Sequence, residues 1–154
     1  MTPAADAGPV PSGAPPPGRV GVARAALVVV ATLFAAGVVG QTLTAGFAVF
    51  VGPGYWPRHR AFVHHFEWLS VVAVVLAYLG RAPRRVKALA WLTVVLLYVQ
   101  YATAGMLARP GLERLAVLHP VSAMLLFWTA AELTRGAARA RRPPPRHGRP
   151  GGTG

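Results

Sequence analysis

Long apolar runs, separated by short segments rich in Gly, Pro and Arg, dominate the pattern of positions along this chain. The pattern predicts helices over 25–51, 61–79, 86–107 and 112–133. At about 1.5 Å of rise per residue, each run is long enough to cross a hydrocarbon core of about 30 Å. We therefore expect an all-α fold, a four-helix transmembrane bundle over 22–134, with the lipid bilayer as its surroundings.

Composition and charge agree with a membrane protein and narrow the classes of function. Of the 154 residues, 54% are hydrophobic and 13% are charged, which is typical of membrane-spanning chains. The Pro/Ala-rich segment 1–20 and the Arg/Pro-rich segment 135–154 are expected to be disordered. The formal charge of +12 resides in tails and loops, so we do not expect nucleic-acid binding. The absence of cysteine excludes disulfides and thiolate metal sites.

The distribution of Lys and Arg predicts the orientation of the bundle. The N-terminal segment, the second loop and the C-terminal tail together carry 12 of these residues, and the first and third loops carry 4. Basic loops stay on the cytoplasmic side of a membrane. We expect a multi-pass protein of the plasma (inner) membrane with both termini in the cytoplasm.

Two stretches of the chain nearly repeat each other. Gln41–Gly46 and Gln100–Gly105 share the pattern Gln-x-x-Thr-Ala-Gly, and each is followed by a loop and a second apolar run with histidine near its start. The histidines are His64 and His65 in the first case and His119 in the second. We expect two tandem helical hairpins related as a parallel pseudo-repeat, with their polar side chains in the outer half of the bilayer.

Ionisable side chains inside a span are costly and indicate a functional site. We expect His119 to pair with His65, and His64 is the alternative partner because neighbouring helical residues point about 100° apart. Pro120 should kink the helix beside His119. Gln41 and Gln100 would lie behind the imidazoles and orient them, or would only join helices by hydrogen bonds. Glu67 could pair with His64, three residues earlier.

Two imidazoles facing each other in a helical bundle suit the axial positions of one b-type haem. The leading hypothesis is a haem-binding membrane protein for electron transfer or haem handling, with His65 and His119 as iron ligands. Zinc would require more ligands than the sequence offers. The alternatives are a structural or partner-binding subunit without cofactor and a small transporter or proton conduit. No catalytic residue set is apparent, and we do not expect an enzyme acting alone.

The strings Phe62–His65, Gln100–Gly105 and Leu118–Ala123 resemble a family of small four-helix prokaryotic membrane proteins of unknown function. In that family Leu-His-Pro-Val-Asn-Ala recurs, and Ser122 stands here in the Asn position. More distantly, the plan resembles one half of haem A synthase, whose four-helix units each bind haem through histidines on their second and fourth helices. That resemblance implies an axial pair of His119 with His64 or His65.

Overall fold

The computed structural model describes residues 18–106 and 109–141, and this part of the chain is helical apart from short connections. Four stretches in it are long and apolar enough to cross a membrane. The predicted all-α architecture is therefore confirmed. The elements are α1 Arg19–Phe50, the 3₁₀ helix η1 Pro53–Tyr55, α2 Trp56–Phe62, the 3₁₀ helix η2 Val63–His65, α3 Trp68–Leu79, α4 Arg84–Met106, the 3₁₀ helix η3 Glu113–Val117 and α5 Leu118–Arg141.

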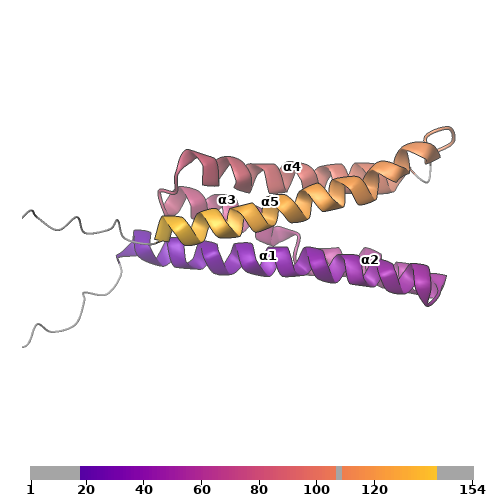
Figure 1. Cartoon of the computed structure of the whole chain (residues 1–154), viewed down its shortest axis with the longest axis horizontal. Coiled ribbons are helices and arrows are strands. Elements are labelled where there is room, and N and C mark those ends of the chain that lie inside the picture. Colours follow the sequence, from indigo (N-terminus) through magenta and orange to yellow (C-terminus); the bar gives the residue numbers. More distant parts are fainter. Residues whose placement is uncertain (1–17, 107–108, 142–154) are drawn as a thin grey trace, which may run out of the picture.

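The helices run side by side in an elongated bundle (Figure 1). α1 packs against α3 and α5, and α4 packs against the same two helices. The second span, which comprises η1, α2, η2 and α3, therefore lies diagonally opposite α5. The start of α1, the turn between α3 and α4 and the end of α5 meet at one end, which we call the terminal end (Figure 1). The connections that follow α1 and α4 lie at the other end, the loop end.

The surface of the bundle is apolar, as lipid contact requires. Large aliphatic side chains are exposed on all four spans, and five of them, Val29, Leu33, Val75, Val95 and Leu125, are each between 51% and 57% exposed. Such a continuous apolar surface is unusual for a protein in water. Together with the length of the helices, it supports association with a bilayer.

Small residues bring the helices together at the terminal end. Ala31, Ala73, Ala77 and Ala90 are at most 1% exposed and allow close contact between backbones. The Arg24 side chain fastens this end, because its Nε donates to the Gly80 carbonyl oxygen at 2.8 Å and its Nη1 donates to that of Ala140 at 3.2 Å.

The second span is interrupted midway by η2, and the two phenylalanines that flank η2 pack on glycines of α1. The Phe66 ring lies over Gly37 and the Phe62 ring lies over Gly40, where a methyl group would come within 2.5 Å and 2.9 Å of the respective rings. Phe66 also meets Phe34 edge-on, at 5.8 Å between ring centroids. These contacts hold the broken helix against α1 without a continuous hydrogen-bond ladder.

Replacing Gly37 with alanine is expected to destabilise the folded chain by about 2 kcal/mol, because the added methyl overpacks the Phe66 ring. The matched control is Gly46→Ala in the same helix, where a Cβ would meet nothing within 4 Å. That control should be neutral or slightly stabilising, because alanine favours the helix. Thermal unfolding in detergent compares the two variants, and equal losses at both positions would contradict the packing of Phe66 on Gly37.

Several predicted boundaries were wrong. Residues 52–60, expected to be a loop, form η1 and the start of α2, with Pro53 and Pro57 in the first turns of these helices, where proline is tolerated. Residues 19–20 and 135–141, expected to be disordered, belong to α1 and α5. The predicted disorder of 1–17 and 142–154 lies outside the described residues. The arrangement of the spans as a parallel pseudo-repeat of two hairpins stays a prediction.

Candidate functional site

The first anchored imidazole at the loop end is His59, in α2. Its Nδ1 lies 3.1 Å from the carbonyl oxygen of Gln41 and 3.2 Å from the hydroxyl oxygen of Thr44. In return, the Gln41 side-chain amide donates to the carbonyl oxygen of His59 at 2.8 Å. The side chain of each residue thus binds the main chain of the other, and the pair joins α2 to α1.

The second anchored imidazole is His119, in α5, and its contacts with α4 match those of His59 with α1. Its Nδ1 lies 3.2 Å from the carbonyl oxygen of Gln100 and 3.1 Å from the hydroxyl oxygen of Thr103. The Gln100 amide donates to the His119 carbonyl oxygen at 3.3 Å and to the Ser122 hydroxyl at 2.8 Å. The Gln-x-x-Thr pattern that repeats in the sequence therefore holds a histidine at both places.

These contacts determine which ring nitrogen carries the proton. A carbonyl oxygen can only accept, so Nδ1 of each ring must be the donor to it. The Thr44 and Thr103 hydroxyl hydrogens are directed to carbonyl oxygens of their own helices, at 2.8 Å from Gln41 and 2.8 Å from Val99. Their oxygens are thus free to accept from the same Nδ1–H. In the neutral ring, Nε2 is then the acceptor atom and the one that can bind a metal ion. In His59 this atom lies 3.4 Å from the side-chain amide nitrogen of Gln41, which a metal ion would have to displace.

The two rings lie close together across the bundle. Their centroids are 6.5 Å apart and their planes make an angle of 77°. A metal ion between two imidazoles requires a separation of roughly 6 Å, from two bonds of about 2 Å and the radius of each ring. Beside them, the Gln41 Oε1 atom is buried without a hydrogen-bond partner in the described part of the chain. The spacing is thus compatible with a shared ligand atom.

Pro120 does not kink a helix beside His119. α5 begins at Leu118, so Pro120 lies in its first turn, where the missing N–H breaks no helical hydrogen bond. The expectation of a mid-helix kink was therefore wrong. His119 instead takes its position from the change from η3 to α5.

His64 and His65 lie apart from this site, and neither is brought to His119. Both are exposed, in η2. The predicted pair of His64 with Glu67 is present, at 3.0 Å between Nδ1 and Oε1, and Tyr101 donates to the other oxygen of that carboxylate. The His65 ring contacts Phe62, at 6.3 Å between centroids.

His59 was not among the site residues predicted from the sequence, although the repeat contains a signal for it. Gln41 precedes His59 by 18 positions and Gln100 precedes His119 by 19, whereas His65 is 24 positions from Gln41. The glutamine main-chain carbonyl and the threonine hydroxyl hold each ring, and the glutamine amide binds the histidine main chain. The Gln41 amide nitrogen also lies 3.4 Å from Nε2 of the His59 ring.

Metal sites of other types find no support in the described residues. Nowhere in 18–106 and 109–141 do three or more His, Cys, Asp or Glu side chains gather as a ligand set. A tetrahedral zinc site built from side chains needs such a set. A haem requires only axial ligands from the protein, because its porphyrin supplies the remaining nitrogens.

Comparison with known proteins finds a family model that matches part of the chain and gives no function. Neither the curated proteins nor the solved structures include a match to this chain. The resemblance to haem A synthase, inferred from short strings, is not borne out by any of these matches. Residues 41–106 match the model of a family of unknown function (DUF6220). The matched segment contains Gln41, His59 and Gln100, and ends before His119.

Proposed function

We propose that this integral membrane protein binds one b-type haem between His59 and His119, for electron transfer or haem handling. The observation that carries the proposal is the pair of anchored imidazoles. Both rings have Nδ1 held by a main-chain carbonyl and a threonine, and their centroids are 6.5 Å apart. A carbonyl partner on Nδ1 is the usual support of a metal-binding histidine, because it fixes the tautomer and makes Nε2 more basic.

The residues present suit such a group through their donor atoms. His59 and His119 would be the axial ligands, with Thr44 and Thr103 fixing the rings. The unpartnered Gln41 Oε1 offers an acceptor beside the pair. When bound, a haem iron with two imidazole ligands supplies one-electron redox chemistry, tuned by those ligands and their hydrogen bonds.

The distribution of charge supports a place for this site near the outer face of the plasma membrane. The turn between α3 and α4 and the last turns of α5 are basic, and both lie at the terminal end. The positive-inside rule would put that end in the cytoplasm. The imidazole pair at the loop end would then lie in the outer half of the bilayer.

A second candidate function is purely structural, and the reciprocal contacts favour it. Gln41 with His59, and Gln100 with His119, each join two helices by hydrogen bonds in both directions. Such pairs could lock a subunit that binds a partner protein and no cofactor. A transporter has less support, because the buried Ser70 and Thr93 hydroxyls bond to their own helices.

The visible spectrum of the full chain, purified in detergent from haem-supplemented cells, tests the proposal. We expect a Soret band and, after reduction with dithionite, sharp α and β bands, with one haem per chain by pyridine haemochrome assay. A colourless protein that also fails to bind added haemin would overturn the proposal. The structural function would then remain, and it predicts that His119→Ala lowers the unfolding temperature of the colourless protein.

A further inference from the structure

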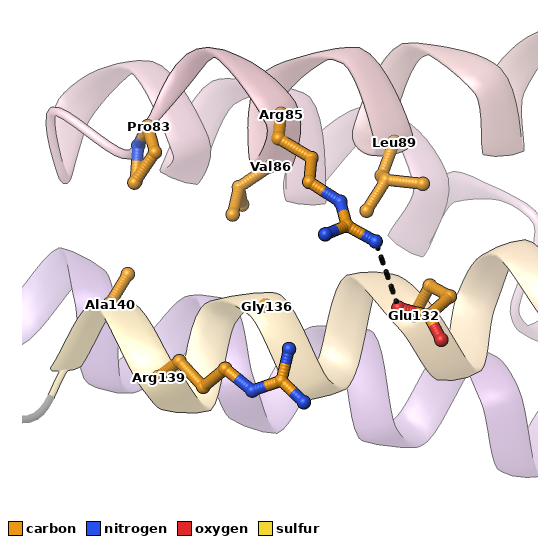
Figure 2. A pocket seen from close by; sticks show the side chains of 8 residues that line it. All are labelled: Pro83, Arg85, Val86, Leu89, Glu132, Gly136, Arg139 and Ala140. Carbon is orange, nitrogen blue, oxygen red and sulfur yellow. Dashed lines mark hydrogen bonds and ion pairs between the residues drawn. The ribbon is translucent and has the colours of Figure 1, made fainter.

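A hollow of about 310 Å³ lies between α4 and α5 at the terminal end (Figure 2), and neither His59 nor His119 lines it. Its wall on α4 includes Arg85, Val86 and Leu89, and its wall on α5 includes Glu132, Gly136 and Arg139. Figure 2 shows the Arg85 guanidinium reaching from α4 toward Glu132. The hollow therefore combines an apolar side with two arginines.

The charge around the hollow is positive even though it contains a carboxylate. Glu132 binds Arg85 at 3.4 Å and Arg135 at 2.6 Å. Arg139 lines the same hollow and has no hydrogen-bonded or ion-pair partner among residues 18–106 and 109–141. The Arg85 side chain is 74% exposed, so its pair with Glu132 is weak and can exchange for another anion.

The position of the hollow indicates what kind of anion can reach it. It lies where the spans end, at the level of the basic turn between α3 and α4. Val86 and Leu89 form the side that continues into the apolar part of α4. A ligand that fits would present a phosphate to the arginines and an apolar portion to this side, which describes a phospholipid at the membrane surface.

We propose that this hollow binds the headgroup phosphate of an anionic phospholipid from the leaflet at the terminal end. The phosphate lies between Arg85 and Arg139, since guanidinium groups bind phosphate oxygens through paired hydrogen bonds. Leu89, on the same wall as Arg85, contacts the first acyl carbons. The site is independent of the haem proposal, because no residue of the imidazole pair contributes to it.

The test titrates the full chain in detergent with phosphatidylglycerol and follows bound lipid by native mass spectrometry. We expect saturable binding that Arg139→Ala weakens about fivefold, the effect of one basic residue at a membrane surface. The matched control is Arg141→Ala, which removes the same charge from the same helix outside the hollow. Equal losses for both variants would mean diffuse attraction only and would overturn the proposal.

Two further arms identify the ligand. Glu132→Gln should tighten binding by about fivefold, because it frees Arg85 and removes a negative charge beside the phosphate. Phosphatidylcholine should show no saturable binding, and millimolar inorganic phosphate should not displace phosphatidylglycerol. If inorganic phosphate displaces the lipid completely, the site recognises soluble phosphate, and the lipid assignment is wrong.

Discussion

Replacing His59 with alanine is expected to remove haem from the purified protein, whereas replacing His65 should leave the spectrum unchanged. His59 is the ring that lies 6.5 Å from His119, and its Nδ1 is fixed by Gln41 and Thr44. His65 is exposed and contacts Phe62. We expect His119→Ala to lose haem as His59→Ala does, because ligation of the iron by two imidazoles requires both rings.

The measurement is the ratio of Soret to protein absorbance at equal protein concentration, with His64→Ala and His65→Ala as controls. Circular dichroism of each variant confirms that the helices remain. Loss of haem in His65→Ala with retention in His59→Ala would contradict the pairing. A site that also lost haem in His64→Ala would have to include Glu67 and Tyr101, the groups that His64 contacts.

The existence of the four membrane-spanning stretches could be predicted from the sequence, because the signals that define a span are local. A bilayer selects for long apolar runs and for basic residues beyond their ends, and both patterns are local in the chain. The Gln-x-x-Thr repeat likewise pointed to Gln41 and Gln100, and each of these side chains bonds to the main chain of a histidine. The sequence did not determine which histidine the first Gln-x-x-Thr segment contacts.

The sequence favoured His65 over His59 because the segment around His59 resembles a loop. Pro53 and Pro57, with Gly52 and Gly54, suggest a break, yet prolines at the first turn begin helices. The span therefore starts earlier and includes His59. Beyond it, the 3₁₀ geometry of η2 advances about 120° per residue, so faces assigned at 100° per residue cannot hold there.

The interruption of the second span depends on contacts between distant residues, which no local pattern reveals. Gly37 and Gly40 each looked like an ordinary small residue of α1, and Phe62 and Phe66 like ordinary apolar positions. In the fold each glycine lies under a phenylalanine ring, and a methyl group at either position would clash with that ring. In contrast, Gly46 and Gly105, singled out because they repeat, have open space around them in the described part of the chain.

Removing the threonine hydroxyls behind the rings is expected to weaken haem binding while the fold persists. Thr44→Val and Thr103→Val keep the shape of the side chain and delete the oxygen that accepts from Nδ1–H at 3.2 Å and 3.1 Å. Each ring then keeps only its carbonyl partner. Loss of such a supporting group costs metal sites about 10–100-fold in affinity. The rate of haem transfer to excess apomyoglobin measures this loss.

The chain offers a matched control for this prediction in Thr42. Its hydroxyl bonds to the carbonyl oxygen of Val38 at 3.1 Å, as helical threonines do, and it contacts neither ring. Thr42→Val should therefore transfer haem at the wild-type rate, and Thr44→Ser should restore most of the loss. If Thr42→Val and Thr44→Val were equally impaired, the threonines would matter only for the helix. If none of the variants changed the rate, the carbonyl oxygens of Gln41 and Gln100 would be sufficient to hold the rings.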